Sequence, residues 1–166
     1  MGVITKAHHM GLQVADLDRS IAFYRDVLGF AVVFRWNPQA EYIRELVGYP
    51  DADIHAVILR LPATDVALEL LEYRNVEREA VDPRTANPGT AHIAFYVDDL
   101  DALYEDLRTR GVPSVSSPVT PTIGPNRGGR AVYMLDPDGI RIELIQTAQS
   151  FESYAGPSSA EVETRG

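Results

Sequence analysis

The sequence predicts an α+β fold made of two paired βαβββ modules, which form a curved mixed sheet around a metal site. Three observations predict it: a repeated segment, alternating apolar side chains along the strands, and a His and a Glu in each half. The repeat relates residues 9–18 to residues 92–101. In both segments Val follows the histidine by five positions, and Asp-Leu-Asp begins after seven. Such self-similarity indicates a duplicated structural unit.

A helix is predicted directly after each repeated segment. Apolar residues recur there at helical spacing, and a glycine closes each stretch, at Gly29 and Gly111. The apolar positions are Leu17, Ile21, Tyr24 and Leu28 in the first half, and Leu100, Leu103, Tyr104 and Leu107 in the second. Acidic residues that suit helix N-termini stand at Asp16, Asp18, Asp98 and Asp99.

Strand-like segments follow each helix. They are residues 30–36, 53–61 and 65–73 in the first half, and residues 112–117, 130–136 and 140–147 in the second. The sequence Asp-Pro-Asp-Gly at 136–139 predicts a hairpin between the last two strands. Each half therefore has the order βαβββ.

The chain is divided on this basis into four parts. The first module covers residues 1–81 and contains an insertion, residues 37–50, with a short helix from Glu41 to Val47. A polar, turn-rich linker follows at 82–90. The second module covers 91–148, and its Pro- and Gly-rich loop 117–129 is expected to border a cleft as a lid. Residues 149–166 are expected to form a flexible tail.

Composition excludes several classes of function. The 166 residues carry a formal charge of −9, which disfavours nucleic acids and anionic membranes as partners. The chain has no cysteine, so disulfides, Cys-zinc sites and thiol nucleophiles are excluded. No apolar run has the length of a signal peptide or a membrane span. We therefore expect a soluble cytoplasmic protein.

Strand alternation places four ionisable side chains opposite aliphatic faces. One His and one Glu belong to each half: His9 and Glu69 in the first, His92 and Glu143 in the second. Neighbouring buried carboxylates are costly unless a cation compensates them. Two neutral imidazoles and two carboxylates sum to −2, so a divalent ion gives a neutral site. Mixed nitrogen and oxygen donors suit Zn, Ni, Co, Mn or Fe(II).

Three segments of the chain resemble the vicinal oxygen chelate superfamily, which includes glyoxalase I, bleomycin-resistance proteins and extradiol dioxygenases. They are AHHMGLQVADLDRSIAFYRDVLGF, GTAHIAFYVDDLDALYEDLRTRGV and YMLDPDGIRIELIQ, within residues 7–147. The resemblance implies paired βαβββ modules around a metal-centred cavity. It implies the metal ligands His9, Glu69, His92 and Glu143, and it selects His9 over the neighbouring His8.

The ligand set separates the subfamilies. Extradiol dioxygenases use two His and one Glu, whereas a fourth protein ligand at the position of Glu69 is typical of glyoxalase I-like and epimerase members. Glyoxalase I usually has Arg at the position of Gln13 and Asn at that of Tyr73. The resemblance therefore favours an isomerase or epimerase and does not imply glutathione as the carrier.

The expected function is that of a metal-dependent isomerase or epimerase, or a lactoylglutathione-lyase-like enzyme, which shifts a proton beside a carbonyl through an enediolate. Glu143 is the first choice as base and Glu69 the second. The substrate is expected to be a small molecule with adjacent oxygens, and the assembly a homodimer. Alternatives are an Fe(II) extradiol-type dioxygenase, a non-catalytic binding protein and a metal-dependent thiol transferase. The residues expected at the pocket wall are Trp36, Tyr42, Tyr96 and Arg127.

Overall fold

The computed structural model describes residues 2–62 and 64–148 in two units, Met1–Asp82 and Pro83–Gly166. Both units combine a mixed sheet with a packed helix, which confirms the expected α+β class. The tail expected to be flexible, residues 149–166, lies outside the described residues.

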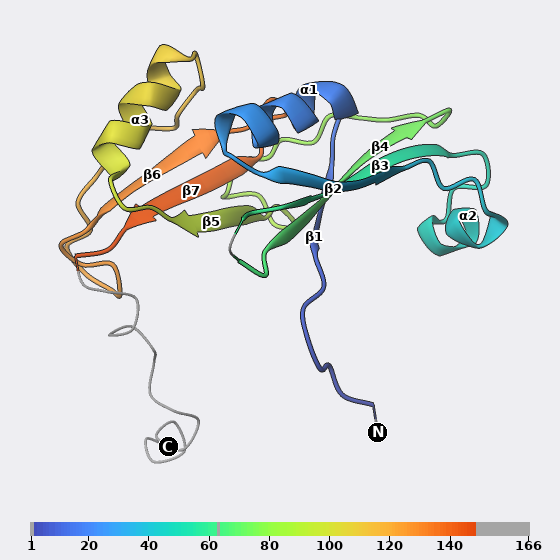
Figure 1. Cartoon of the computed structure of the whole chain (residues 1–166), viewed down its shortest axis with the longest axis horizontal. Coiled ribbons are helices and arrows are strands. Elements are labelled where there is room, and N and C mark those ends of the chain that lie inside the picture. The colour runs from blue at the N-terminus through green and yellow to red at the C-terminus, as the bar shows by residue number, and fades with distance from the viewer. Residues whose placement is uncertain (1, 63, 149–166) are drawn as a thin grey trace. The chain divides into compact units, whose positions relative to one another are not determined.

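The first unit contains a four-stranded mixed sheet. The strands follow the order β1-β4-β3-β2, with β1 parallel to β4 and the other neighbours antiparallel (Figure 1). Their bounds are β1 Met10–Gln13, β2 Ala31–Trp36, β3 Asp53–Arg60 and β4 Ala67–Arg74. The three strands predicted after the first helix are confirmed. The parallel pairing of β1 with β4 brings the start of the unit beside its last strand.

Helix α1 (Leu17–Ala22) begins where the sequence predicts it. The carboxylate of Asp16 accepts a hydrogen bond from the backbone N–H of Arg19 at 2.9 Å, and this satisfies one of the free donors of the first turn. The chain leaves the helical region at Gly29, whose φ of 77° suits a residue without a side chain. The expected cap and glycine stop are both confirmed.

The second half of this helix is wider than the sequence predicts. Residues Phe23–Val27 form a π-helical segment, η1, closed by a bond from Leu28 N–H to the Phe23 carbonyl at 3.3 Å. The extra residue in the turn places Phe23 and Tyr24 both in the core, with ring centroids 5.3 Å apart. A regular 3.6-residue period does not anticipate two adjacent buried aromatic residues.

The core of the first unit lies between α1 and the sheet. The helix contacts β3 and β4 and lies over one face of the sheet (Figure 1). The side chains on that face are mostly aliphatic. Its large side chains without exposed surface are Leu17, Tyr24, Val57, Leu59, Leu68 and Leu70. Each such side chain stabilises the fold by about 1.5–3 kcal/mol relative to an exposed one. The aliphatic face predicted for β4 is thus buried, and Glu69 lies on the opposite face.

A buried carboxylate joins α1 to the sheet on the helix-covered face. Glu72 accepts two hydrogen bonds from the Arg74 guanidinium, at 2.8 and 3.0 Å, and one from the Leu17 N–H at 3.4 Å. The bonds from Arg74 lower the pKa of Glu72, against the opposing effect of its burial. The folded state therefore favours the charged carboxylate.

Substitution of Glu72 by Gln is expected to lower the free energy of unfolding at pH 7 by about 1.5–3 kcal/mol, because charged hydrogen bonds are lost. Since the folded pKa lies below the unfolded value, this contribution is full above the unfolded pKa and disappears as the pH falls through the folded one. Urea denaturation at several pH values checks this, with the surface variant Glu41→Gln as control. A difference between wild type and Glu72→Gln that grows toward acidic pH contradicts this role of Glu72.

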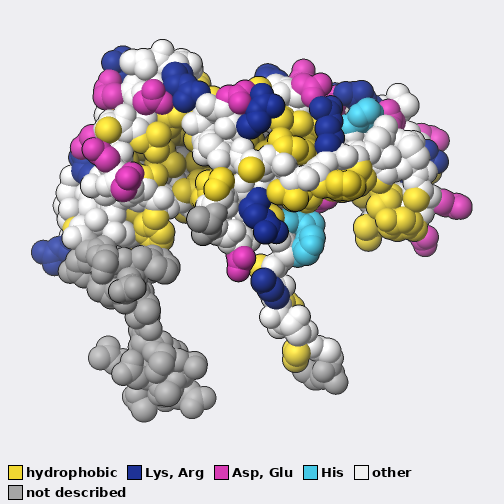
Figure 2. All heavy atoms as spheres, in the orientation of Figure 1, with side chains coloured by type: hydrophobic (Ala, Val, Ile, Leu, Met, Phe, Trp, Pro, Cys, Tyr) yellow, Lys and Arg dark blue, Asp and Glu magenta, His cyan; other side chains and the backbone are white. Residues whose placement is uncertain are grey.

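Helix α2 (Glu41–Val47) forms the predicted helix of the insertion and ends at Gly48. None of its residues is buried. Its apolar side chains include the exposed Tyr42 and Leu46, and Figure 2 shows this apolar surface at the end of the first unit where α2 lies. Among the described residues, no helix has both the length and the apolar character that crossing a bilayer requires.

In its described part, residues 83–148, the second unit contains a three-stranded mixed sheet and one helix. The strand order is β5-β7-β6, with β5 parallel to β7 and β6 antiparallel to it. The bounds are β5 His92–Tyr96, α3 Leu100–Thr109, β6 Arg130–Leu135 and β7 Arg141–Gln146. Asp99 caps α3 by accepting a bond from the Ala102 N–H at 3.0 Å, and α3 contacts β7. The central elements repeat the arrangement of β1, α1, β3 and β4.

The prediction of a strand at 112–117 is wrong. The segment runs beside β6 but makes only an isolated bridge, between Ser114 and Met134. Two bonds support it: Val115 N–H to the Tyr133 carbonyl and Leu135 N–H to the Pro113 carbonyl, both at 2.9 Å. Pro113 has no N–H to donate, and the serines that follow have low strand propensity. A continuous ladder does not form for these reasons.

The hairpin predicted at 136–139 joins β6 to β7. The carboxylate of Asp136 accepts bonds from the N–H groups of Asp138 and Ile140, at 2.9 and 2.8 Å. The Gly139 N–H closes the turn on the Asp136 carbonyl at 3.0 Å. This turn fixes the register of the two strands, and hence which β6 side chain lies opposite Glu143.

Candidate metal centre and pocket

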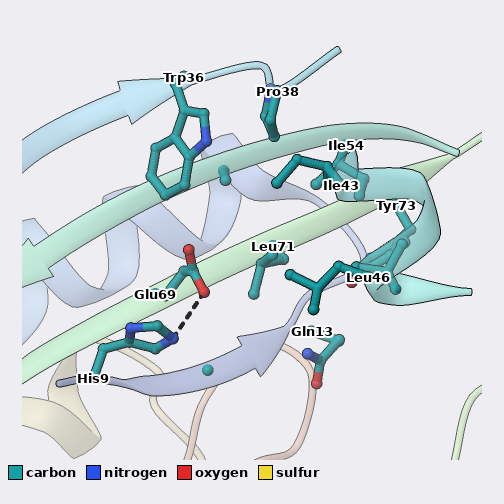
Figure 3. Close-up of a pocket in the computed structure, with 13 residues that line it drawn as sticks. His9, Gln13, Trp36, Pro38, Ile43, Leu46, Ile54, Glu69, Leu71 and Tyr73 are labelled. Atoms are coloured by element: carbon teal, nitrogen blue, oxygen red, sulfur yellow. Dashed lines mark ion pairs between the residues drawn. The ribbon is translucent and has the colours of Figure 1, made fainter. Parts of the chain in front are cut away.

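The first unit brings His9 and Glu69 together. His9 lies directly before β1, and Glu69 lies in the neighbouring strand β4, with Gly11 as its paired residue. The His9 Nε2 atom is 3.0 Å from the Glu69 Oε2 atom. A dashed line marks this pair in Figure 3. The sequence predicts both residues for one site, and within this unit they are in contact.

The second unit repeats this arrangement with His92 and Glu143. His92 begins β5, and Glu143 lies in β7 opposite Ala94. The His92 Nε2 and Glu143 Oε2 atoms are 3.2 Å apart. In both units a small residue, two positions after the histidine, faces the glutamate. The glutamate side chains are only 16% and 21% exposed, so their charges are partly removed from water.

The donor atoms of each pair suit a divalent transition-metal ion. Two ligands about 2.1 Å from one ion, at a right angle, lie about 3.0 Å apart. Both nitrogen–oxygen distances are close to this value. Within the described part of either unit, no third His, Asp or Glu joins the pair in a metal-binding group. Each unit therefore offers one His–Glu pair as a candidate pair of metal ligands.

Tyr133 is a residue of the candidate site that sequence reasoning missed. It lies opposite Glu143 in the β6–β7 ladder, where its hydroxyl can act as a donor toward that carboxylate. Its ring lies at right angles to the imidazole of His92, with the centroids 5.4 Å apart. Burial, and then the charge of Glu143, raise the pKa of Tyr133, so the hydroxyl keeps its proton at neutral pH. In the first unit the residue opposite Glu69 is Ile58, which cannot donate.

Removal of the Tyr133 hydroxyl is expected to weaken metal binding or turnover by about 10–100-fold, as is typical of groups that orient a ligand. Tyr133→Phe keeps the ring and its contact with His92, so the fold is retained. The metal dissociation constant, measured by competition with a chromogenic chelator, checks this. The exposed Tyr42→Phe is the matched control. Equal metal affinity and turnover in Tyr133→Phe and wild type contradict a positioning role.

A pocket opens beside His9 and Glu69 in the first unit. Its volume is about 280 Å³, and it lies between β1, β4, β2 and helix α2 (Figure 3). Most of its wall is apolar: Trp36, Pro38, Ile43, Leu46, Val47, Ile54, Ala56 and Leu71. His9, Gly11 and Gln13 line it together, as strand alternation predicts. The pocket thus joins a pair of potential metal ligands to an apolar chamber.

Expectations for the pocket wall are met in part. Trp36 lines the pocket, as predicted. Tyr42 does not: it lies on the outer side of α2 and is 66% exposed, because the helix turns Ile43 and Leu46 toward the cavity instead. Tyr96 and Arg127 belong to the second unit, and their place at the site stays a prediction.

Two neutral polar side chains also line the pocket, Gln13 and Tyr73. Burial raises the pKa of Tyr73, and the charges of Glu69 and Tyr49 act in the same direction. The phenol is therefore protonated at neutral pH and can donate a hydrogen bond. Tyr49, which follows α2, packs edge-on against Tyr73 with the ring centroids 5.9 Å apart. This contact ties the insertion to the sheet.

The two remaining histidines do not line the pocket. The Nδ1 atom of His8 is 2.6 Å from the Nδ1 atom of His9, so His8 is a neighbour of the pair. The Nε2 atom of His55 is 3.2 Å from the Asp53 carboxylate. His55 stands opposite Glu72 in the sheet, on the alternate face from the pocket-lining Ile54 and Ala56.

Comparison with known proteins defines the family. Residues 6–144 match the model of the Glyoxalase/Bleomycin resistance protein/Dioxygenase superfamily, and the chain belongs to this superfamily. The chain is 36% identical over 143 residues to a 2-epi-5-epi-valiolone epimerase of an Actinomyces species, covering 83% of this chain and 77% of that protein. It is 35% identical to the lactoylglutathione lyase of Haemophilus influenzae, covering 83% of this chain and 90% of the lyase.

Solved structures show the same fold. A glyoxalase family protein from Bacillus cereus superimposes with a TM-score of 0.73 at 21% identity, covering 87% of this chain and 95% of that one. The fold and the resemblance predicted from the sequence are thus confirmed. The curated relatives include both an epimerase and a lyase, so the family supports an isomerase or lyase type of enzyme that acts on a small molecule.

Proposed function

We propose that the protein is a metal-dependent isomerase or epimerase that moves a proton on the carbon next to a carbonyl group. One observation carries the proposal: each unit holds a His–Glu pair with its donor atoms 3.0 or 3.2 Å apart. Glu69 favours an isomerase over an oxygenase, because it supplies a second carboxylate where a two-His, one-carboxylate oxygenase has an open position.

His9, Glu69, His92 and Glu143 together are the proposed ligands of one divalent cation. Two neutral imidazoles and two carboxylates carry a charge of −2, which Zn, Ni, Co, Mn or Fe(II) in the divalent state neutralises. When bound, such a cation polarises a carbonyl and stabilises the negative charge that develops on its oxygen. The four ligands come from one chain or, in a homodimer, from two.

Glu143 is the proposed base. Its carboxylate lies beside His92, and Tyr133 stands opposite it in the sheet, so two neighbours can orient it. It would take the proton from the carbon beside the carbonyl and return it to the same or the adjacent carbon. A base in this position contributes about 10²–10⁴-fold to the rate. Glu69, without a donor opposite it, is the second candidate.

The names of the relatives support this class of reaction. The epimerase and the lactoylglutathione lyase are each matched over 83% of this chain, at 36% and 35% identity. A small-molecule substrate with adjacent oxygens fits a pocket of about 280 Å³ that opens beside a His–Glu pair. Either an isomerisation or an epimerisation is consistent with a base that moves one proton.

Deuterium exchange tests the proposal even when the product has not been identified. The protein loaded with Ni²⁺, Zn²⁺ or Co²⁺ is incubated in ²H₂O with α-hydroxyketones, and with the glutathione adduct of methylglyoxal. Nuclear magnetic resonance then follows the carbon-bound proton beside the carbonyl. Enzyme-dependent exchange is expected for at least one compound. Absence of exchange, together with oxygen consumption by the Fe(II) form on catechols, would indicate a dioxygenase instead.

A further inference from the structure

We propose that residues 38–48, the part of the insertion that carries α2, form a lid on one side of the pocket of the first unit, and that the side chain of Gln39 is the latch that holds this lid closed. The opening motion is independent of the proposed function. The effect of the lid on a substrate rests on that function, because the pocket lies beside the proposed metal ligands His9 and Glu69.

Helix α2 is held weakly against the rest of the unit. None of its residues is buried, and no described element packs against it as closely as β3 and β4 pack against α1. So short a helix is not stable alone and depends on tertiary packing. The residue before it, Ala40, has no side chain that can cap the first turn. A segment with so few stabilising contacts opens at a low cost in free energy.

One side of α2 forms part of the pocket wall. Ile43, Leu46 and Val47 line the pocket, together with Pro38 ahead of the helix. Figure 3 shows Ile43 and Leu46 projecting from α2 toward the strands. Movement of α2 away from the strands would remove this part of the wall. The lining residues of β2 and β4 would stay in place, so such a motion changes access to the pocket and leaves the sheet intact.

The chain is anchored beyond the C-terminal end of the lid. Tyr49 packs edge-on against Tyr73 of β4, with the ring centroids 5.9 Å apart, and Ala52 is buried. Between this anchor and α2 stands Gly48, whose φ of 74° lies in the left-handed region that glycine enters without strain. Hinges are short segments that absorb a change in backbone angles. Gly48 is placed to be the hinge at this end.

Gln39 joins the lid to the sheet at the other end. Its amide nitrogen donates a hydrogen bond to the Asp53 carboxylate at 2.9 Å, and another to the side-chain oxygen of Asn37. Its amide oxygen accepts a bond from the Arg44 guanidinium of α2 at 3.4 Å. The bond from Gln39, and then the contact with His55, lower the pKa of Asp53. The carboxylate is therefore charged at neutral pH and holds α2 to β3 through Gln39.

The closed position of the lid also contains a feature that favours opening. The Nε atom of Arg44 is buried and has no hydrogen-bond partner among the described residues. A buried donor without a partner disfavours the state that buries it, and opening returns this atom to water. Gln39 is exposed, so water can replace its hydrogen bonds. The latch is thus one that can be released.

Amide hydrogen exchange of the full-length protein, followed by mass spectrometry, tests the latch. In Gln39→Ala and Asp53→Ala the amides of α2 are expected to exchange about three- to tenfold faster, the effect of losing a typical hydrogen bond, while those of β4 are unchanged. Asp51→Ala is the matched control, because Asp51 is an exposed aspartate of the same segment. No acceleration in either latch variant, or equal acceleration in α2 and β4, would overturn the proposal.

A disulfide across the latch tests whether opening exposes the pocket. The chain has no cysteine, so Gln39→Cys combined with Asp53→Cys introduces a single possible bond. Trp36 is the only tryptophan and lines the pocket, so quenching of its fluorescence by acrylamide reports access. Quenching is expected to be about twofold weaker in the oxidised form than in the reduced form. Equal quenching in both forms, or failure of the two cysteines to pair, would contradict the lid.

Activity measurements separate failure of the lid from failure of the proposed function. Faster amide exchange in α2 of the latch variants, without enzyme-dependent exchange of any substrate proton, would overturn the isomerase proposal while the lid holds. Activity of the wild type, with amide exchange in α2 unchanged by both latch substitutions, would overturn the lid and leave the isomerase proposal intact. With an active compound, the oxidised double variant is expected to lose kcat/KM and to regain it on reduction.

Discussion

Glu143→Gln is expected to reduce kcat by about 10²–10⁴-fold, which is the usual contribution of a positioned base. Glutamine keeps an oxygen that can accept the Tyr133 hydrogen bond and approach a cation, but it cannot accept the proton. The variant should therefore retain part of its bound metal. Turnover or deuterium exchange, measured at saturating metal, checks the rate, and elemental analysis checks the metal content.

Two further variants make this result specific. Glu69→Gln changes the corresponding glutamate of the first unit, and a smaller loss of kcat there assigns the base to Glu143. Glu105→Gln changes an exposed glutamate of α3 whose carboxylate pairs with Arg108 on the same helix, and it should leave kcat unchanged. Full activity of Glu143→Gln, or a larger loss in Glu69→Gln, contradicts the assignment.

His9→Ala and His92→Ala are each expected to weaken metal binding by more than about 100-fold, since even residues that only orient a ligand cost about 10–100-fold. The two losses should be similar, because each histidine begins the same arrangement beside its glutamate. Competition with a chromogenic chelator measures both dissociation constants. Activity should fall in parallel and return in part at high metal concentration.

His55→Ala is the matched control for these variants. His55 is a histidine of the same first unit whose Nε2 atom lies near the Asp53 carboxylate, and it does not line the pocket. Its removal should leave metal affinity unchanged. A loss of affinity in His55→Ala equal to that in His9→Ala, or a loss in only one member of the His9 and His92 pair, would contradict ligation by one histidine from each unit.

Much of the fold follows from local sequence rules. The Asp16 and Asp99 caps and the glycine stops were predictable because a helix needs those residue types at its ends. The contact between His9 and Glu69 was predictable from alternation along β1 and β4. The prediction of a strand at 112–117 was wrong because Pro113 has no backbone N–H to donate to a ladder with β6.

Other features of the site needed tertiary structure. Tyr133 could have been found, since the hairpin at 136–139 pairs residues symmetrically and places 133 opposite 143. The part of the wall formed by α2 could not have been predicted from the sequence. The insertion has no counterpart among the described elements of the second half, so the repeat gives no guide to its position. Only the position of Ile43 and Leu46 in the lining shows that α2 forms part of the pocket wall.

Anomalous scattering from crystals grown with the preferred metal tests the central claim most directly. We predict one ion for each copy of the chain, coordinated by the imidazoles of His9 and His92 and the carboxylates of Glu69 and Glu143, at about 2.0–2.2 Å. An ion held by other residues, or separate ions on the two His–Glu pairs, would contradict it.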